Sequence, residues 1–384
     1  MDTQFIYYKP VTGRHFIGRQ TDCNIFSNLL RQGENVVIDE PARTGKASMM
    51  QNVFFQMRIG GETLHTAEFS FLNVRTAEEA FAGLGSAILR TLGNEADELA
   101  ELASQFLAGT HFVFDREIYG NGGRPLSLNW AMEDSDARAV LELPYRIATA
   151  RGQKVYVVLH EFQNILKLKE GERYCRMLED VFASRTEEDR KLAAYVLSGS
   201  QVNAMKDIFE HRKMFFRQVE RVALSKIDTK EIVDYVIKGF LSSGKVIDKE
   251  LMLGACKLFD NNIWYINHFV AICDSFSKGY LMEPVLMDAL DALISIHQPR
   301  FEATMNDLTT FQVNLLKAIV DGYTRFSSAQ VIRDYGLNSS ANVRRLKDAL
   351  CKKEIVTGDD LSLTIIDPLF EYWIKKYYFR KREA

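Results

Sequence analysis

The first half of the chain alternates short apolar runs with segments of helical spacing, and this alternation restricts the fold more than any other sequence feature. The strongest run is Val155-Tyr156-Val157-Val158-Leu159. The other runs cover residues 35–38, 67–74 and 193–197, with a weaker one at 219–224, and helical segments lie between them at 80–92 and 174–184. Short buried strands that alternate with helices predict a parallel sheet covered on both faces. We therefore expect an α/β domain at residues 16–225, after an N-terminal extension at residues 1–15.

The strand signal stops near residue 225, and a helical pattern replaces it. Helical spacing covers residues 231–241, 249–259, 263–276 and 284–296. This pattern predicts a helical lid subdomain at residues 226–300. The segment at 105–150 contains a glycine-rich stretch at 120–124, and we expect it to form a loop and a helix that return the chain to the sheet.

The last part of the chain, residues 301–384, has the order of elements of a winged helix. Predicted helices lie at 310–321, 327–335 and 339–353, with a turn at Gly336, and a short hairpin follows at 355–366 around Gly358-Asp359-Asp360. Helix-turn-helix followed by a two-stranded wing defines this module. A final helix at 368–378 ends in the basic tail Arg380-Lys381-Arg382.

Composition places the chain among ordinary globular proteins. It has 384 residues, 47% of them hydrophobic, and 48 basic against 51 acidic residues, a net charge of -3. This balance excludes a chain that is polybasic as a whole. None of the five cysteines is spaced as C-x-x-C, so we expect neither a disulfide framework nor a structural zinc site. We find no signal-peptide pattern and no apolar window of about 18 residues, and we expect a cytoplasmic protein without a membrane partner.

The segment after the first strand is close to a phosphate-binding loop. It is Glu40-Pro41-Ala42-Arg43-Thr44-Gly45-Lys46-Ala47-Ser48, compared with the pattern G-x-x-x-x-G-K-[ST]. Gly45 and Lys46 match, whereas Glu40 replaces the first glycine and Ala47 replaces the Ser or Thr. A strand precedes the segment and a helix is predicted at 47–57, which is the required context.

These residues predict a phosphate-binding site that lacks a hydroxyl needed to bind the metal ion. Backbone N–H groups of residues 44–47 and the Lys46 ammonium would bind phosphate oxygens. Ala47 lacks the hydroxyl that would bind Mg²⁺. Ser48 keeps a hydroxyl that could contact the α-phosphate. Glu40 adds negative charge that opposes anion binding unless its side chain turns to solvent.

The strand at 155–159 ends in His160-Glu161-Phe162-Gln163. An Asp at position 160 would hold Mg²⁺ through water, and the Glu after it would polarise the attacking water. Here the metal position is His160, while Glu161 remains as the candidate catalytic base. Because the Mg²⁺ supports at positions 47 and 160 are both missing, we predict weak or absent metal-dependent hydrolysis and assign no metal site.

Taken in order, these motifs resemble the archaeal/bacterial ATPase group of the STAND and AAA-type P-loop NTPases, over about residues 10–378. The matching segments are Phe16-Ile17-Gly18-Arg19-Gln20, His160-Glu161-Phe162-Gln163, Gly199-Ser200, Arg217, Asn261-Asn262-Ile263-Trp264-Tyr265-Ile266 and Asp367-Pro368-Leu369-Phe370. The resemblance implies that Gly18 and Arg19 line an adenine pocket, that Ser200 senses the γ-phosphate, and that Arg217 acts as a catalytic residue beside Glu161.

Each of these residues also has a purely structural interpretation. Lys46 would then be solvated, and Glu161 would be a buried carboxylate that caps the next helix. His160 would be a hydrogen-bonded histidine at a sheet end rather than a transition-metal ligand. Gly18-Arg19 would be a turn with a surface arginine, and Ser200 a helix cap.

The helix predicted at 339–353 carries Arg344, Arg345 and Lys347 opposite an apolar face of Val343, Leu346 and Leu350. Such a helix can enter a DNA major groove. From residue 305 onward, 13 basic residues stand against 10 acidic ones, which is a weak electrostatic basis for DNA binding. The resemblance implies instead that the winged helix packs on the ATPase domain or binds protein.

The sequence therefore predicts an ATP-binding switch or scaffold of the STAND/AAA type, with ATP or ADP as its ligand and no firm role for Mg²⁺. We expect a protein partner or self-association. Two alternatives remain: an active ATPase with unusual metal ligation, and a nucleotide-independent DNA-binding regulator.

Overall fold

The computed structural model describes residues 4–358 and 363–380. The chain forms two compact units. The first, here called the winged-helix unit, comprises Met1–Arg19, Pro41–Ser48 and Ser225–Ala384. The second, here called the sheet unit, comprises Gln20–Glu40 and Met49–Leu224. The phosphate loop thus lies in the winged-helix unit, although the strand before it lies in the sheet unit.

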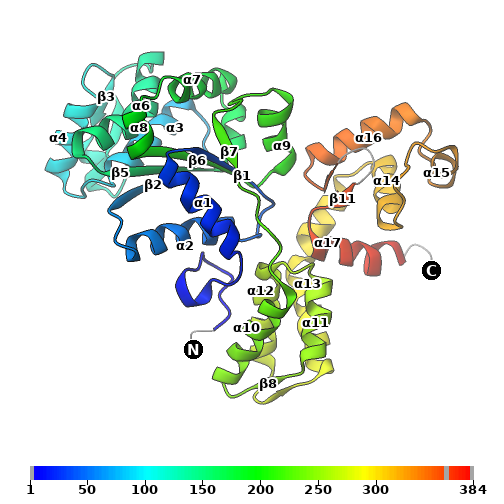
Figure 1. Ribbon diagram of the computed structural model, residues 1–384. Coiled ribbons are helices and arrows are strands. Elements are labelled where there is room, and N and C mark those ends of the chain that lie inside the picture. Colours follow the sequence, from blue (N-terminus) through cyan, green and yellow to red (C-terminus); the bar gives the residue numbers. More distant parts are fainter. Residues whose placement is uncertain (1–3, 359–362, 381–384) are drawn as a thin grey trace. The chain divides into compact units, whose positions relative to one another are not determined.

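A five-stranded parallel sheet forms the centre of the sheet unit (Figure 1). Its strands are β1 (Asn35–Asp39), β2 (Leu64–Ser70), β5 (Lys154–His160), β6 (Ala193–Gly199) and β7 (Val219–Arg221), in the order β2-β5-β6-β1-β7. The predicted parallel α/β sheet is confirmed. β5 and β6 are buried along almost their whole length because helices cover both faces.

Helices α1 (Gln20–Gln32) and α2 (Lys46–Ile59) cover one face of the sheet, and α3 (Ala77–Leu89), α6 (Asp134–Arg151) and α7 (Gly171–Ala183) cover the other. Successive side chains of β5 point to opposite faces of the sheet. Tyr156 stacks on Phe54 of α2 at 5.8 Å, and its hydroxyl donates to the Leu30 carbonyl of α1 at 3.3 Å. Val157, the next residue, belongs to the core beneath α3 and α6.

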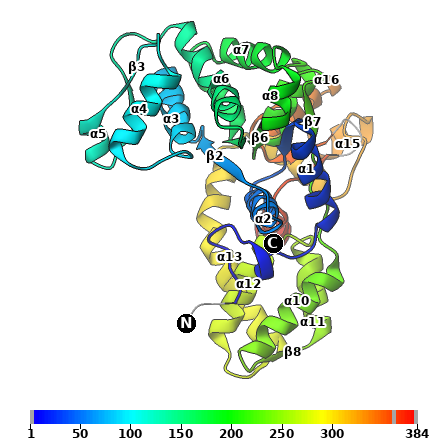
Figure 2. The ribbon, with the colours of Figure 1, turned by 60° about the vertical axis from the view of Figure 1, so that its left-hand side comes forward.

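The structure corrects two expectations for the sheet unit. The strand predicted at 67–74 is Leu64–Ser70, because Asn73 has a φ of 64° and Leu72 is 60% exposed, so the extended run cannot continue. The segment at 105–150 is more than a loop and a helix. It contains the antiparallel hairpin β3 (Phe112–Phe114) and β4 (Leu126–Leu128), with α4 (Ala96–Phe106) before it and α5 (Arg116–Gly120) at its turn (Figure 2).

The remaining elements of the sheet unit are short. They are the 3₁₀ helix η2 (Phe162–Lys167), α8 (Glu187–Leu192), α9 (Val202–Lys206) and the π-helix η3 (Asp207–His211).

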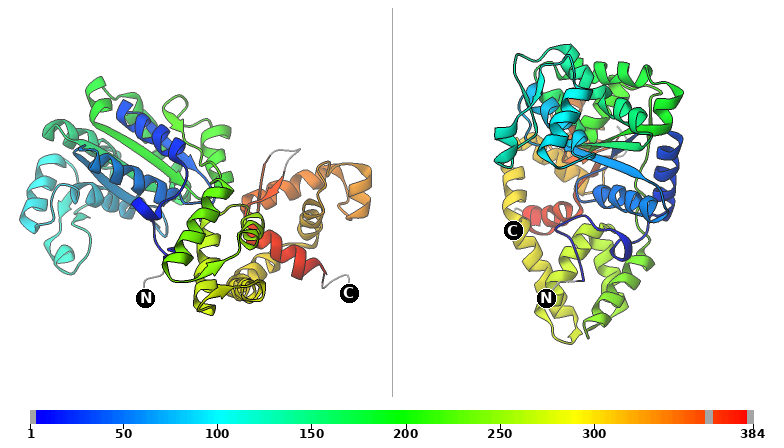
Figure 3. Two further views of the ribbon diagram at one scale, coloured as in Figure 1. Left: turned by 60° about the horizontal axis from the view of Figure 1, so that its bottom comes forward. Right: turned by 90° about the vertical axis from the view of Figure 1, so that its left-hand side faces the viewer.

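From Ser225 onward, the winged-helix unit consists of a group of helices followed by the predicted winged helix (Figure 3). The first group is α10 (Thr229–Ser242), α11 (Lys249–Leu258), α12 (Ile263–Phe276) and α13 (Glu283–Asn306), with the parallel strand pair β8 (Val246–Ile247) and β9 (Tyr280–Leu281). The second is α14 (Thr310–Val320), α15 (Ala329–Asp334), α16 (Ser340–Lys352), the wing strands β10 (Val356–Thr357) and β11 (Thr364–Ile365), α17 (Pro368–Trp373) and the π-helix η4 (Ile374–Phe379). The predicted turn residues Asp359 and Asp360, and Lys381 and Arg382 of the tail, lie outside the described residues.

Helix α13 continues past the lid boundary that the sequence suggested at residue 300. Pro299 lies inside the helix, although a proline there removes one backbone hydrogen bond. The buried side chain of Phe301 explains why the helix continues, since its ring lies 5.4 Å from Phe370 and 5.6 Å from Trp373. One hydrophobic core therefore runs through the lid helices and the winged helix.

The N-terminal segment belongs to the same core. Phe5 is 1% exposed and lies 4.9 Å from Phe240 of α10. A Cβ on Gly239 would come within 2.6 Å of the Phe5 ring. None of the described helices is long and apolar enough to cross a bilayer.

Candidate functional site

The phosphate loop has the predicted strand–loop–helix geometry. β1 ends at Asp39, and α2 begins at Lys46. Gly45 immediately before the helix has a φ of 95°, and a Cβ there would lie 2.9 Å from the Arg19 guanidinium. Only glycine fits this position, and the N-terminus of α2 that follows is favourable for an anion.

Two side chains of the loop donate hydrogen bonds to one carbonyl group of the same loop. The Lys46 ammonium donates to the Pro41 carbonyl at 2.8 Å, and the Thr44 hydroxyl donates to the same oxygen at 2.8 Å. Lys46 is therefore not the solvated side chain of the structural alternative. A phosphate would have to compete with this contact, and a hydrogen bond to a charged group contributes about 1.5–3 kcal/mol.

Arg19 contacts the loop, whereas a Cβ on Gly18 would lie 2.7 Å from Ile227, and the adenine-pocket role of the two residues stays a prediction. Both adopt left-handed conformations, with φ of 65° and 58°. The Arg19 guanidinium donates to the carbonyls of Thr44 (2.5 Å) and Ser225 (2.8 Å). Arg19 thus links the N-terminal segment, the phosphate loop and the start of the lid.

Ser48 and the substituted residue Glu40 have structural roles that the sequence did not indicate. The Ser48 hydroxyl accepts the N–H of Val11 at 3.2 Å and so anchors the N-terminal segment to α2. Glu40, within the sheet unit, accepts the N–H of Leu224 at 2.9 Å. Ala47 in the first turn of α2 has no hydroxyl for a metal.

A cavity of about 60 Å³ lies between the loop, the N-terminal segment and α12. Its walls include Phe16, Ile17, Gly45, Ile227, Ile263 and Trp264. Apolar and aromatic walls beside a phosphate loop suit a nucleotide base, but ligand pockets usually enclose about 300–1,000 Å³. A base can enter only if the surrounding segments move apart.

Arg43, in the middle of the loop, reaches the lid helix α12. Its φ is 68°, its guanidinium lies 4.3 Å above the Trp264 ring, and Nη1 donates to the Tyr265 hydroxyl at 3.2 Å. Asn262 fixes the start of α12, because its side chain accepts the N–H groups of both aromatic residues.

Tyr265 connects Arg43 to the winged helix. Its hydroxyl donates to the Asp367 carboxylate at 2.8 Å, and Arg300 of α13 donates to both groups, at 3.1 and 2.8 Å. Asp367 also caps α17 by accepting the N–H groups of Leu369 and Phe370. Burial and the neighbouring carboxylate raise the pKa of the Tyr265 hydroxyl, so it remains a donor. We call Arg43, Tyr265, Arg300 and Asp367 the loop–wing network.

Two buried histidines border the network. His268 stacks on Tyr7 at 4.1 Å, and His297 lies 5.6 Å from His268. Burial and the nearby Arg43 lower the pKa of both, that of His297 to about 4. Both rings are therefore neutral at pH 7.

The strand-end residues form a separate cluster in the sheet unit. Glu161 follows β5 with a φ of 51°, and its Oε2 accepts from the Ser200 hydroxyl (2.6 Å) and the Gln163 amide (2.7 Å). The structure thus brings together the two residues that the sequence proposed as base and sensor. Neither caps a helix with its side chain, because α9 begins after Gln201 and no side-chain cap occurs at Glu161.

Acidic and basic groups near the strand ends are paired. His160 lies 3.1 Å from Glu68, and this hydrogen bond is the main cause of the lowered pKa of Glu68. Asp39 lies 3.2 Å from Arg221; burial raises the pKa of Asp39, and the arginine opposes this effect. The part of the chain that the structure describes contains no group of three or more His, Cys, Asp or Glu side chains arranged to hold a metal.

Of the remaining candidate residues, Arg217, Arg344 and Arg345 are exposed and Lys347 is half-buried. Arg217 has a φ of 59°, and its guanidinium lies 5.1 Å from the ring of the exposed Phe216. On α16, Val343, Leu346 and Leu350 are buried and Arg344 and Arg345 are exposed, as predicted. Lys347 lies 5.4 Å from the Phe326 ring.

A family model described as a probable winged helix domain matches residues 299–376. No curated protein matches the chain. Among solved structures, a Walker-type ATPase of Pyrococcus abyssi is 16% identical, with a TM-score of 0.68 over 97% of this chain and 100% of that one. The ORC2 protein of Aeropyrum pernix, solved with ADPNP and ADP, is 12% identical, with a TM-score of 0.59 over 99% and 98%.

The ORC1 protein of Aeropyrum pernix, solved with DNA, is 11% identical, with a TM-score of 0.50 over 96% of this chain and 95% of that one. At these identities the comparisons establish architecture. The chain has the fold of Walker-type, AAA-type ATPases that carry a C-terminal winged helix.

Proposed function

We propose that this protein is a nucleotide-responsive switch that binds ATP or ADP at the loop around Gly45 and Lys46, with weak or absent hydrolysis. The observation that carries the proposal is the loop–wing network, in which a residue of the phosphate loop, Arg43, is connected through Tyr265 to Asp367 of the winged helix. A ligand that rearranges the loop therefore changes the contacts that hold α17.

Binding would begin with exchange of partners at Lys46. The ammonium leaves the Pro41 carbonyl and binds phosphate oxygens, while N–H groups at the start of α2 contribute further donors. Arg19 holds the loop carbonyl of Thr44 from the other side. These residues would bind the phosphates without requiring a metal ion.

The base would enter the small cavity next to Trp264 as the N-terminal segment and the lid move apart. Ser48 and Val11 form one contact that must adjust. The nucleotide thus selects an open arrangement of these segments, and the network carries that change to the winged helix. This is a shift between populations whose size depends on the difference in affinity for the two arrangements.

Slow hydrolysis follows from the two metal positions. Ala47 offers no hydroxyl, and His160 is hydrogen-bonded to Glu68. Glu161 keeps the chemical capacity of a general base, but its Oε2 is already shared by two donors. If Ala47→Thr/His160→Asp restores Mg²⁺ binding, phosphate release should rise above that of the natural chain. A double variant that binds Mg-ATP and stays inactive contradicts this account.

The direct test is titration with a fluorescent ATP analogue, once with Mg²⁺ and once with EDTA. We expect binding in both conditions and its loss in Lys46→Ala. Absence of binding at millimolar nucleotide contradicts the switch. Binding only with Mg²⁺, together with phosphate release that requires Lys46, favours an active ATPase with unusual metal ligands.

A second candidate function is DNA binding by the winged helix. It is favoured by the exposure of Arg344 and Arg345 on α16, opposite the buried face of that helix. Salt-dependent binding of duplex DNA that is lost in Arg344→Ala/Arg345→Ala and unchanged by nucleotide would support a nucleotide-independent regulator.

A further inference from the structure

The outer edge of the sheet is formed by β2, and no other strand of residues 4–358 or 363–380 pairs with that edge. The pairing with β5 determines which peptide groups are exposed there. Phe71 N–H donates to the His160 carbonyl at 2.9 Å, and successive peptide groups of a strand point to opposite sides. The N–H and C=O groups of Thr66, Glu68 and Ser70 therefore face away from β5. Such an edge is a template for another extended chain.

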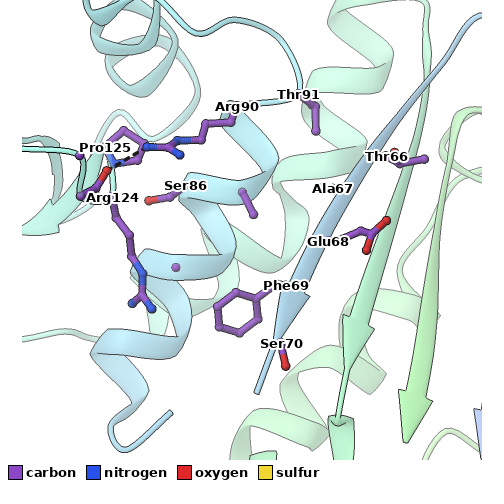
Figure 4. Close-up of a pocket in the computed structure, with 14 residues that line it drawn as sticks. Thr66, Ala67, Glu68, Phe69, Ser70, Ser86, Arg90, Thr91, Arg124 and Pro125 are labelled. Atoms are coloured by element: carbon purple, nitrogen blue, oxygen red, sulfur yellow. Dashed lines mark hydrogen bonds between the residues drawn. The ribbon is translucent and has the colours of Figure 1, made fainter. Parts of the chain in front are cut away.

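A hollow of about 600 Å³ lies along this edge (Figure 4). The consecutive residues 66–70 all line it. Because alternate side chains point to opposite faces, a hollow bordered by consecutive residues follows the strand edge rather than one face. Helix α3 borders the hollow with the small residues Gly83, Ser86 and Ala87. A Cβ on Gly83 would lie 2.5 Å from the Phe69 ring, so the glycine allows α3 to pack closely against the strand at this point.

The wall opposite the strand carries positive charge. Arg90 and Arg124 line the hollow and are both exposed. Arg90 donates to the Gly123 carbonyl at 2.8 Å, and Arg124 donates to the Glu79 carbonyl at 3.0 Å, with the Glu79 carboxylate 3.6 Å away. Each guanidinium has five N–H donors, and these contacts orient the groups while using only part of that capacity. Glu68 on the strand is paired with His160.

We propose that this edge binds an extended peptide segment with acidic side chains. The segment pairs with the peptide groups of Thr66, Glu68 and Ser70 as an additional strand and places its carboxylates against Arg90 and Arg124. The edge offers both N–H donors and C=O acceptors, which a peptide main chain matches. A phosphate backbone accepts hydrogen bonds but cannot donate to those carbonyls. The proposal is independent of the nucleotide site.

The test uses the full chain and a fluorescein-labelled peptide, Glu-Val-Glu-Val-Glu-Val-Glu, followed by fluorescence anisotropy. We expect saturable binding that weakens about tenfold or more in Arg90→Glu/Arg124→Glu, since the variant loses the charge-assisted hydrogen bonds to the peptide carboxylates. Arg146→Glu is the matched control and should bind normally. Arg146 is an exposed arginine of the same unit that lines a separate hollow of about 610 Å³.

Two peptide controls separate charge from strand pairing. The lysine counterpart, Lys-Val-Lys-Val-Lys-Val-Lys, should not bind, and proline at the central valine should weaken binding because it removes a main-chain donor. Hydrogen exchange of segment 64–71 should slow when the acidic peptide is bound. No saturable binding at millimolar peptide, equal binding of the lysine peptide or unchanged exchange overturns the proposal. Preferential binding of a dodecamer of thymidylate through the same arginines overturns it in favour of single-stranded nucleic acid.

Discussion

The loop around Lys46 and the strand-end cluster around Glu161, which the proposed function assigns to phosphate binding and to residual hydrolysis, are held in place in different ways. The loop is connected to groups far away in the sequence: Arg43 contacts α12, and the network reaches Asp367. Glu161 is held within the sheet unit by Ser200 and Gln163, near the ends of the adjacent strands β6 and β5. The proposed function therefore predicts that nucleotide binding at the loop alters the contacts of the winged helix, whereas changes in the strand-end cluster stay within that cluster.

Substitution of Lys46 should have the largest effect on nucleotide affinity. It should distinguish the role of the loop from that of the strand-end cluster. Lys46→Ala removes the charged phosphate ligand, and we expect nucleotide affinity to fall roughly 10- to 100-fold. Glu161→Gln keeps the hydrogen-bonded cluster and should leave affinity nearly unchanged. Isothermal titration calorimetry of both variants measures the difference. Equal losses would show that the two regions do not differ in this way.

Removal of Asp367 tests the connection to the winged helix. Asp367→Ala leaves Arg300 and the Tyr265 hydroxyl without their acceptor and removes the cap of α17. We expect the free energy of unfolding to fall by about 2–3 kcal/mol. Nucleotide-induced protection of α17 from hydrogen exchange should disappear.

Tyr265→Phe serves as the milder comparison, since it removes one hydroxyl and keeps the ring. The predicted loss of stability is about 1 kcal/mol. If nucleotide still changes hydrogen exchange at α17 in both variants, the network is not the route between loop and wing.

Lowering the pH should decrease the free energy of unfolding through His297, before the carboxylates are protonated. The folded-state pKa of His297 is lowered to about 4 by burial, whereas an unfolded histidine has a pKa near 6.5. The unfolded state therefore binds more protons as the pH falls below about 6.5, and stability decreases toward pH 4. Between pH 7 and pH 5 we expect a loss of up to about 2 kcal/mol.

Urea unfolding of the natural chain and of His297→Gln at both pH values measures this contribution. The variant should have a flatter pH dependence. An identical slope in the two proteins would mean that His297 does not titrate as the structure indicates. His268 has a lowered pKa as well, so the variant should retain part of the effect.

Disruption of the strand-end cluster should have the smallest effect. Ser200→Ala removes one of the two donors to Glu161, and Gln163 remains. We expect a loss of about 0.5–1.5 kcal/mol in unfolding free energy and no change in nucleotide affinity. A large loss of affinity in Ser200→Ala would assign ligand sensing to this cluster.

Much of the fold was predictable because it depends on local patterns. Apolar runs of strand length alternate with helical spacing, and the strand–loop–helix context around Gly45 and Lys46 indicated the phosphate loop despite Glu40 and Ala47. The apolar face of α16 follows in the same way from the helical period. The hairpin at β3 and β4 escaped prediction because each strand covers only three residues. Such strands depend on tertiary support, for example from the Asp136 carboxylate, which accepts the N–H of His111 at 2.8 Å.

The sequence by itself determined the order of elements, the strand–loop–helix context around Gly45 and Lys46, and the absence of a hydroxyl at Ala47 and of a carboxylate at His160, since these depend on residue identity and short-range spacing. Only the tertiary structure decided the partners of individual side chains. Asp367 meets Tyr265 across 102 positions of sequence, and Ser48 meets Val11 across 37. The physical reason is that a buried polar group must find a hydrogen-bond partner within about 3 Å. Which group lies there depends on how the whole chain packs.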